Sequence, residues 1–338
     1  MERIAVIGAG AWGTTLARVL ALKGHNVTLW AREEEVCASI ASGRENAAYL
    51  PGVKLPENLS ATSSLEEALS GGGGNGGAQM VVSVVPSHGL RAVFAGAAPF
   101  VPAGAVLVSA TKGIEQSTLL TASGVLKEVL SGVEGLNIVV LSGPSFAREV
   151  SQGLPTALCA GSSSASAASA VQHAFSTPYF RVYTNTDVVG VELGGALKNV
   201  MAIASGISDG LGLGNNARAA LITRGLAEMS RLGVKMGARE QTFSGLSGLG
   251  DLVLTCTGAL SRNYTVGLEV GRGRTAREVT GSMRMVAEGV KTSMAARALG
   301  RREGVQMPIT DEICDVLEGK TAPREAVLEL MTRELKEE

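Results

Sequence analysis

The chain has 338 residues, 45% hydrophobic and 18% charged, so it can form a globular protein with a large buried core, and its length favours two domains. Its net charge of −1, with acidic and basic residues interleaved, and its aromatic content of only 4% argue against a nucleic-acid or anionic-membrane partner. The cysteines form no CxxC pair, the histidines lack metal-ligand spacing, and there is no long uncharged apolar run. Because the first expected strand begins almost at Met1, we expect no signal peptide. We therefore expect a protein of a reducing compartment, with no structural metal and no membrane span.

The first thirty residues have the pattern of a βαβ unit. An apolar run over residues 3–7 predicts a strand, and a helix and a second strand ending at Trp30 follow. The sequence GAGAWG lies directly between the first strand and the helix. There Gly8 permits a tight turn, Gly10 lets backbone approach a pyrophosphate, and Gly13 lets the helix pack on the strand. Because the chain has 44 glycines, this strand–turn–helix context, rather than the spacing alone, predicts a dinucleotide-binding site.

The residues after the second strand bear on the choice of cofactor. An acidic residue at this point would hold the adenosine ribose 2′-hydroxyl of NAD. The chain instead has Arg32, whose guanidinium could pair with the 2′-phosphate of NADP, so NADPH is favoured over NADH. Glu33 beside it weakens this prediction, and a solvated surface arginine is the alternative interpretation.

The strand pattern continues as far as residue 187, and helical patterns follow it. We expect an α/β protein: an N-terminal Rossmann-type domain (residues 1–190) with a mainly parallel sheet, then an all-α C-terminal domain (residues 191–338) that binds substrate. The low-complexity run GGGGNGG at residues 71–77 is expected to be a peripheral surface loop. The later strands are expected at residues 80–85, 105–110, 138–141, 156–160 and 180–183.

Ligands of open parallel sheets bind at the carboxyl ends of the strands. Lys112, Gly143 and Ser145 all follow predicted strands closely, which makes them candidates for substrate contacts. For Lys112 the alternative is an ordinary surface lysine.

A second candidate lysine lies in the apolar segment 193–207, which predicts a helix buried on all sides. Lys198 interrupts this segment, although an unpaired ammonium taken out of water costs several kcal/mol or loses its proton. Either Lys198 reaches the surface from the start of the helix with its stem on apolar neighbours, or it points into a cleft and acts on a substrate.

Two further polar clusters lie in the second half. The run SGLSGLGD is a glycine-rich turn that ends in Asp251. Ser261, Arg262 and Asn263 offer a hydroxyl, a guanidinium and an amide at a helix start, which suits a phosphate, although a plain helix cap has the same composition. Glu288 also begins a helix, where complementarity to the helix dipole is the simpler explanation.

Taken with these motifs, the chain resembles the bacterial-type NAD(P)-dependent glycerol-3-phosphate dehydrogenases. The family interconverts dihydroxyacetone phosphate and sn-glycerol 3-phosphate for phospholipid synthesis, and its bacterial members are cytoplasmic and usually dimeric. The matching stretches cover both expected domains, and the long central one is specific to this family: IAVIGAGAWGTTLA, LSGPSFAREV, GGALKNVMAIASGISDGLGLGNNARAALITRGLAEM, FSGLSGLGDLVLTCTGALSRNYTVG and VAEGVKT.

The resemblance implies that Lys198 is the proton acceptor in oxidation and the proton donor in reduction. It also implies a homodimer that uses NADP or NAD. Ala11 departs from the family, because relatives often have serine there. Expected substrate contacts are Lys112, Gly143, Ser145, Lys198 and Asp251, with Ser261, Arg262 and Asn263 at the phosphate end. Expected cofactor contacts are Gly8, Gly10, Ala11, Trp12, Gly13, Arg32, Tyr49, Lys112, Ala147, Arg262, Val286 and Glu288.

The residue types fit this chemistry. A lysine near pKa 10 is a poor base, but desolvation and a second cation, for which Lys112 is the candidate, would lower its pKa. Two alternatives stay open. A related dehydrogenase for another phosphorylated or carboxylated hydroxy-substrate would lack the Ser261–Asn263 cluster, and a non-catalytic cofactor-binding regulator would have lost Lys198 or Lys112.

Overall fold

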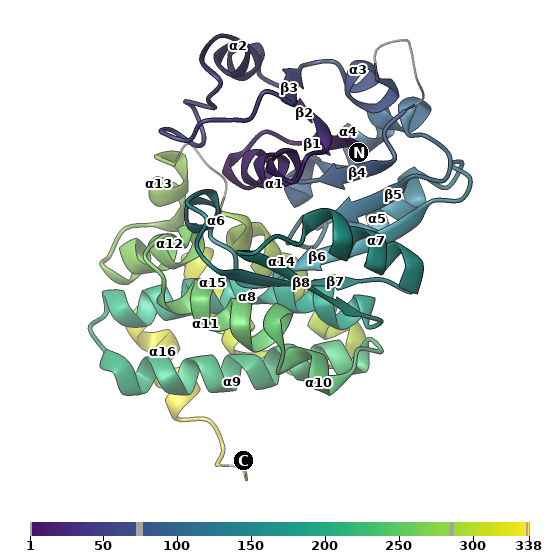
Figure 1. Ribbon diagram of the computed structural model, residues 1–338. Helices are drawn as coiled ribbons and strands as arrows, with labels where there is room; N and C mark the ends of the chain where they lie inside the picture. The colour runs from purple at the N-terminus through teal and green to yellow at the C-terminus, as the bar shows by residue number, and fades with distance from the viewer. Residues whose placement is uncertain (1, 72–76, 284–286, 336, 338) are drawn as a thin grey trace. The chain divides into compact units, whose positions relative to one another are not determined.

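The computed structural model describes residues 2–71, 77–283, 287–335 and 337, and it divides into two compact units (Figure 1). The first unit comprises Met1–Thr111 and Ala122–Val191, and the second comprises Lys112–Thr121 and Glu192–Glu338. The segment Lys112–Thr121, which the sequence analysis assigns to the first domain, therefore groups with the second unit. The reason is its bonds to helices of that unit, which are described below.

The first unit is built on an eight-stranded sheet with the order β3-β2-β1-β4-β5-β6-β7-β8. Every neighbouring pair is parallel except β6 and β7, which run antiparallel, so the predicted Rossmann-type, mainly parallel fold is confirmed. Strand β3 was not predicted, because its short sequence LSAT has little hydrophobic signal. The strands are β1 (Arg3–Ile7), β2 (Asn26–Trp30), β3 (Leu59–Thr62), β4 (Met80–Ser83), β5 (Val106–Ser109), β6 (Asn137–Ser142), β7 (Thr156–Gly161) and β8 (Phe180–Asn185).

Strands β1 and β4 in the middle of the sheet are buried on both faces. Ile4, Val6 and Val82 belong to a core cluster that also contains Leu16 of α1 and Phe175 of α7. The side chains between them, such as Ala5, Ile7 and Val81, are buried as well, as continuous apolar runs in a parallel sheet predict. The helices of this unit are α1 (Ala11–Leu22), α2 (Glu34–Gly43), α3 (Leu65–Ser70), α4 (Ser87–Ala97), η1 (Ala98–Phe100), α5 (Ala122–Val129), α6 (Ala147–Ser151) and α7 (Ala165–Phe175).

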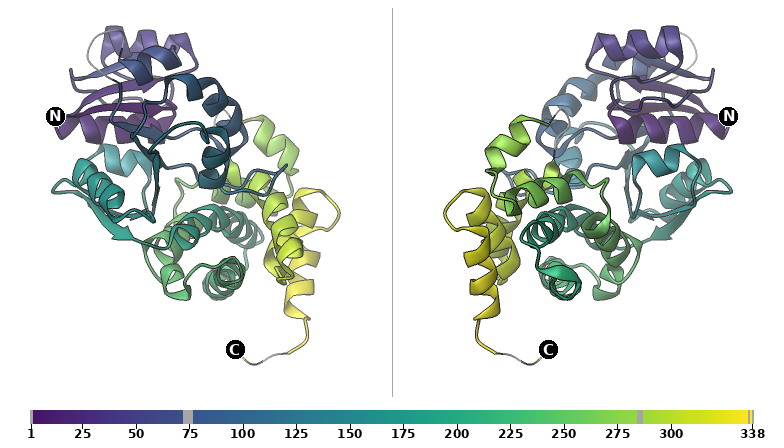
Figure 2. Two further views of the ribbon diagram at one scale, coloured as in Figure 1. Left: turned by 90° about the vertical axis from the view of Figure 1, so that its right-hand side faces the viewer. Right: turned by 90° about the vertical axis from the view of Figure 1, so that its left-hand side faces the viewer.

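The second unit consists of helices, as expected, together with the segment Lys112–Thr121 (Figure 2). Helix α8 (Val188–Gly210) begins at the end of the first unit and continues into the second. By length and composition α8 could cross a membrane, as could one bent pair, Glu240–Thr257 with Arg262–Gly271, but 89% of the apolar window of α8 is buried inside the protein. The other helices are α9 (Gly214–Lys235), α10 (Glu240–Phe243), η2 (Leu246–Gly250), α11 (Asp251–Thr257), α12 (Arg262–Gly271), α13 (Ala276–Gly281), α14 (Glu288–Glu303), α15 (Pro308–Leu317) and α16 (Pro323–Met331).

Helices α8 and α12 meet along four glycines, which we call the glycine seam: Gly206 and Gly210 on α8, Gly267 and Gly271 on α12. A Cβ added at Gly206 would lie 2.1 Å from the carbonyl oxygen of Tyr264, and one at Gly267 would lie 2.0 Å from that of Ile203. Both distances are far inside van der Waals contact, so only glycine permits this approach. The seam fixes the position of the start of α12 relative to α8.

Candidate active site

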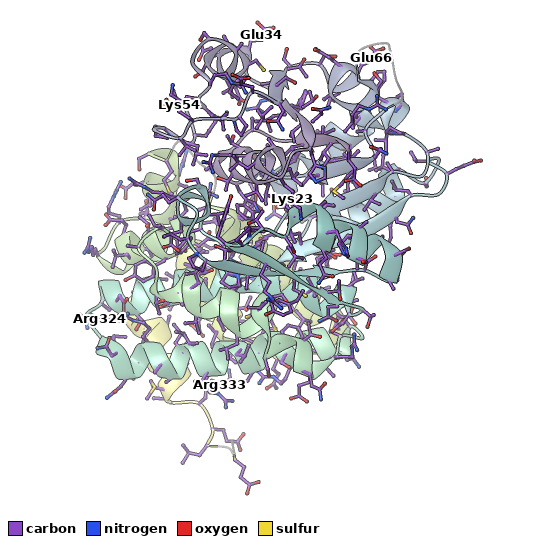
Figure 3. The ribbon with its side chains drawn as sticks, viewed as in Figure 1. Lys23, Glu34, Lys54, Glu66, Arg324 and Arg333 are labelled. Atoms are coloured by element: carbon purple, nitrogen blue, oxygen red, sulfur yellow. The ribbon has the colours of Figure 1, made fainter. Side chains whose placement is uncertain are left out.

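Lys198 lies in the middle of α8, and its side chain is only 8% exposed. Lysine and arginine side chains such as Lys54, Arg324 and Arg333 point outward from the protein, as Figure 3 shows. Because α8 begins ten residues before Lys198, the alternative in which this lysine reaches the surface from the first turn is wrong. A buried ammonium requires partners, and the structure provides them.

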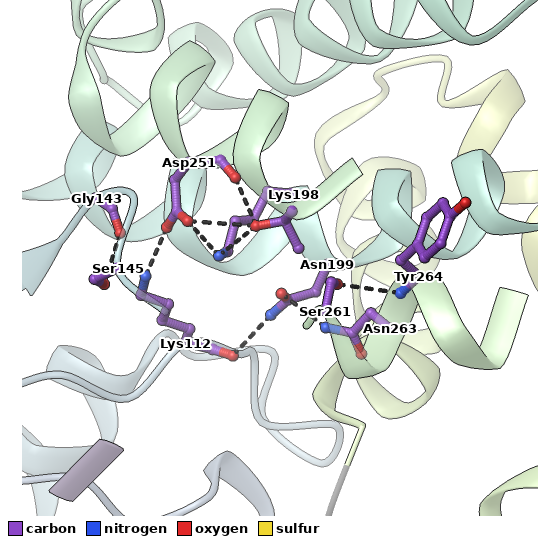
Figure 4. Close-up of polar contacts among 10 residues, drawn as sticks. Lys112, Gly143, Ser145, Lys198, Asn199, Asp251, Ser261, Asn263 and Tyr264 are labelled. Atoms are coloured by element: carbon purple, nitrogen blue, oxygen red, sulfur yellow. Dashed lines mark hydrogen bonds and ion pairs between the residues drawn. The ribbon is translucent and has the colours of Figure 1, made fainter. Parts of the chain in front are cut away.

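Asp251 is the main partner. It follows η2, a π-helical turn where the sequence predicted a glycine-rich turn, and π-helical turns occur often at functional sites. Gly194 admits this turn against α8, because a Cβ there would lie 2.4 Å from the carbonyl oxygen of Ser247. Lys198 lies one helical turn further along the same face. Its Nζ donates to Asp251 Oδ1 at 2.5 Å, and Lys112 Nζ donates to Asp251 Oδ2 at 2.6 Å (Figure 4).

Thr255 completes the surroundings of the Lys198 ammonium. Its Oγ1 accepts from Lys198 Nζ at 2.8 Å and donates to the backbone oxygen of Asp251 at 2.6 Å. An ammonium has three N–H donors, and Asp251 and Thr255 account for two of them. The third can serve a substrate oxygen.

One carboxylate therefore lies between two ammonium groups, and Asp251 is only 1% exposed. Burial lowers the pKa of Lys198 from 10.5 to about 8; the negative charge of Asp251 opposes this shift and the positive charge of Lys112 adds to it. A group that titrates near neutrality can both give and take a proton under physiological conditions, which is what general acid–base catalysis requires. Two cations beside a carbonyl oxygen would also stabilise a developing alkoxide.

The predicted phosphate cluster lies at the start of α12, in the same unit. Ser261 caps the helix, because its hydroxyl accepts from the backbone N–H of Tyr264 at 3.2 Å. Asn263 is buried and bonded to Asn199 and to the backbone of Gly289. Glu288 is close enough for its charge to act on Arg262. Val286, another predicted cofactor contact, lies outside the described residues.

The predicted dinucleotide turn has the geometry that its glycines imply. Gly8 has a φ of 117°, and a Cβ on Gly13 would lie 1.8 Å from the carbonyl oxygen of Gly8. A Cβ added at Gly10 would meet nothing within 4 Å, so protein packing does not require a glycine there. A ligand pyrophosphate that approaches the backbone would require one. No side chain caps the start of α1, which includes Ala11 and Trp12. Its first N–H groups are suited to an anion.

Other predicted cofactor contacts lie around this turn. The hydroxyl of Thr15 on α1 donates to the backbone oxygen of Ala147 at 3.2 Å. Asn46, which is fully buried, donates to the backbone oxygen of Ala9 at 2.8 Å and accepts from the backbone N–H of Tyr49 at 3.2 Å. The loop that carries Tyr49 is thus bonded to the glycine-rich turn.

The remaining candidates follow strands of the first unit. Arg32 lies two residues after the end of β2, with a side chain that is 82% exposed and donates to Glu33 at 3.0 Å. Gly143 comes after β6 with a φ of 139°, and its backbone oxygen accepts from the Ser145 hydroxyl at 3.0 Å. Among the described residues no three histidine, cysteine or acidic side chains form a group that could hold a metal.

Sequence reasoning missed Thr255, Asn199 and Asn46. A signal existed for Thr255, since it follows Asp251 by four residues in a helix and so shares its face. Asn199 stands next to Lys198, but nothing in the sequence indicates which residue it bonds. Nothing in the sequence connects Asn46 with the glycine-rich turn.

A Rossmann-type sheet with a glycine-rich first turn, together with a helical unit that buries a lysine with a lowered pKa, is typical of nicotinamide-dependent dehydrogenases. Family models for NAD-dependent glycerol-3-phosphate dehydrogenase match residues 3–168 with the N-terminal part and residues 187–328 with the C-terminal part. The chain belongs to this family.

Individual relatives are similar to this chain over nearly its whole length. It is 58% identical to glycerol-3-phosphate dehydrogenase [NAD(P)+] of Citrifermentans bemidjiense over 337 residues, covering 100% of this chain and 99% of the relative. The enzyme of the same name from Geobacter sulfurreducens is also 58% identical, with the same coverage. The crystal structure of glycerol-3-phosphate dehydrogenase from Coxiella burnetii superposes with a TM-score of 0.91 at 40% identity, covering 98% of this chain and 99% of that one.

Proposed function

We propose that the chain catalyses the reversible reduction of dihydroxyacetone phosphate to sn-glycerol 3-phosphate with NADPH or NADH. The observation that carries this proposal is the arrangement of Lys198, Asp251 and Lys112, a buried proton donor beside a second cation. When bound, the nicotinamide supplies the hydride to C2 of the substrate. Lys198 gives a proton to the C2 oxygen in reduction and takes it back in oxidation. Asp251 orients the ammonium, and Lys112 stabilises negative charge on the substrate oxygen.

The ligand-binding roles follow from the same reasoning. In this proposal the glycine-rich turn binds the cofactor, and further cofactor contacts are assigned to Ala11, Trp12, Arg32, Tyr49, Ala147, Val286 and Glu288. Ser261, Arg262 and Asn263 are assigned to the substrate phosphate, and Gly143 and Ser145 to further substrate contacts.

The direct test is an initial-rate assay of dihydroxyacetone phosphate reduction with each reduced cofactor. We expect rapid, substrate-dependent oxidation of NADPH and slower oxidation of NADH. No turnover of dihydroxyacetone phosphate with either cofactor would reject the proposed function, and turnover of a carboxylated keto-substrate in its place would favour a related dehydrogenase.

The physiological setting is part of the proposal. The product would supply the glycerol backbone of phospholipids, in the cytoplasm, from a homodimeric enzyme. All four cysteines, Cys37, Cys159, Cys256 and Cys314, are free thiols, which suits a reducing compartment. Light scattering coupled to size-exclusion chromatography would test the dimer.

The pKa of Lys198 gives a prediction about pH. Reduction needs the ammonium form, so its rate is expected to fall as the pH rises through about 8, whereas oxidation needs the neutral amine and its rate is expected to rise over the same range. Rate profiles in both directions would check this. If the rates of reduction and oxidation changed in the same direction with rising pH, the role of Lys198 would be contradicted.

Arg262 is expected to matter through the substrate phosphate. Arg262→Ala should raise KM for dihydroxyacetone phosphate steeply, because a charge-assisted bond worth about 1.5–3 kcal/mol is lost. Little further loss is expected with unphosphorylated dihydroxyacetone, measured relative to the wild type. Equal losses with both substrates would assign Arg262 to the cofactor or the fold.

Arg32 is expected to set the cofactor preference. In the wild type kcat/KM should be higher with NADPH than with NADH, by a modest ratio because Glu33 pairs with the guanidinium. Arg32→Ala should reduce kcat/KM for NADPH by roughly tenfold to a hundredfold and spare NADH. A wild type that prefers NADH, or a variant that loses both cofactors equally, would exclude this role.

A further inference from the structure

A chain of side-chain amides runs through the second unit, from the start of α14 to the backbone of Lys112. The backbone N–H of Gly289 donates to Asn263 Oδ1 at 2.9 Å, and Asn263 Nδ2 donates to Asn199 Oδ1 at 2.9 Å. Asn199 Nδ2 then donates to the backbone oxygen of Lys112 at 3.3 Å (Figure 4 shows the last two bonds). We call these four residues the amide relay. It connects three helices, α14, α12 and α8, with the segment Lys112–Thr121.

The direction of the amide relay is fixed by its two ends. One end is a backbone N–H, which can only donate, and the other is a backbone C=O, which can only accept. Rotating the amide of either asparagine would place oxygen against oxygen or nitrogen against N–H. Each side chain therefore has one orientation that satisfies both of its neighbours. Both asparagines are at least nine-tenths buried, so water cannot readily replace a lost partner.

The elements that the amide relay joins lie in close contact. A Cβ added at Gly289 would lie 2.6 Å from the backbone oxygen of Asn199 and 2.9 Å from Asn263 Oδ1. At the other end, Lys112 is held twice: its backbone by Asn199 and its ammonium by Asp251. The segment Lys112–Thr121 gains a further bond from Gln116, which donates to the backbone oxygen of Lys291 on α14 at 3.3 Å.

We propose that Asn199 and Asn263 are positioning residues: they hold the backbone of Lys112 against α8 so that its ammonium reaches Asp251 and the substrate. Asn263 then affects the reaction mainly through Asn199 and only secondarily as a direct ligand of the substrate phosphate. This inference rests on the proposed function. It gives Asn263 a main role other than the phosphate contact that was expected from the sequence.

A double-mutant cycle separates the two roles. Asn199→Ala and Asn263→Ala are each expected to lower kcat/KM for dihydroxyacetone phosphate by roughly tenfold to a hundredfold. Because a relay broken at one link is already lost, the double variant should lose little more than the more damaging single variant. If the two losses multiply, Asn263 acts independently of Asn199 and the inference is overturned.

A second readout does not depend on overall stability. Displacing Lys112 removes a cation that lowers the pKa of Lys198. The pH at which the reduction rate falls should therefore be higher in both single variants than in the wild type. A limb that stays at its wild-type position in both would overturn the inference. Should an alanine variant fail to fold, Asn263→Asp keeps the size and the acceptor for Gly289 while breaking the link to Asn199, and it is expected to lower kcat/KM over the same range. Wild-type kcat/KM in that variant would overturn the inference.

The matched control is Asn58 in the first unit. Its Nδ2 also bonds two backbone oxygens, of Ala21 at 2.8 Å and of His25 at 2.7 Å. Asn58→Ala should lower the melting temperature without changing kcat/KM or the pH profile. A wild type that does not reduce dihydroxyacetone phosphate would reject the proposed function itself, whereas an active wild type with multiplicative losses rejects only the relay.

Discussion

Lys198→Met is expected to lower kcat for dihydroxyacetone phosphate reduction by about 10²–10⁴-fold while NADPH still binds. Methionine has similar length and an apolar stem, so it can fill the buried space in α8, but it carries no proton to donate. Asp251 keeps the Lys112 ammonium as its counter-charge in this variant, so no buried charge is left unpaired and the variant should fold. Steady-state kinetics and cofactor fluorescence would measure the two effects separately.

The matched control for this variant is Lys235→Met, at the exposed end of α9. It makes the same chemical change where the ammonium is solvated, and kcat should be unchanged. A Lys198→Met enzyme that retains more than a third of wild-type kcat would show that Lys198 is not the proton donor.

Asp251→Asn is expected to be nearly as damaging, for a different reason. The amide has the shape of the carboxylate, but it leaves the Lys112 and Lys198 ammoniums close together without a shared counter-charge. Breaking a buried ion pair at one partner costs about 3–5 kcal/mol of stability, so the melting temperature should fall. Because the Lys198 ammonium also loses the partner that orients it, kcat/KM is expected to fall by about 10²–10³.

The pH profile distinguishes this effect from general damage. Asp251 raises the pKa of Lys198, so its loss should move that pKa below about 8. The fall in the reduction rate would then begin at lower pH than in the wild type, so the variant should perform relatively better at acidic than at neutral pH. A limb at the wild-type position would mean that Asp251 does not act on Lys198 electrostatically.

The sequence was sufficient where local pattern and chemistry coincide. An apolar helix interrupted by Lys198 left two interpretations open, a lysine that reaches the surface and a lysine in a cleft, and the structure shows that its side chain is buried. The strand–glycine–helix order around Gly13 also predicted the first βαβ unit. The turn, the close packing and the hydrophobic runs of this unit are all encoded within thirty residues.

Long-range bonding could not be predicted in this way. Residues 112–121 follow a strand of the first unit and were expected to stay with it, yet their partners, Asp251, Asn199 and Lys291, lie far away in the sequence. The π-helical turn before Asp251 was also missed, because glycine-rich sequence favours turns in general and the π form depends on packing against Gly194. Partners of this kind depend on tertiary contacts that leave no periodic pattern.

The glycine seam has a consequence for the genetics of this protein. Every single-nucleotide missense change in a glycine codon introduces a side chain of at least one carbon atom. At Gly206, Gly210, Gly267 and Gly271 that carbon would lie 2.0–2.5 Å from a backbone atom of the facing helix. The helices would have to separate, and the start of α12, with Arg262, would move relative to Lys198. These codons should therefore tolerate no missense change, and a saturation library selected for glycerol 3-phosphate synthesis should return only synonymous variants at all four.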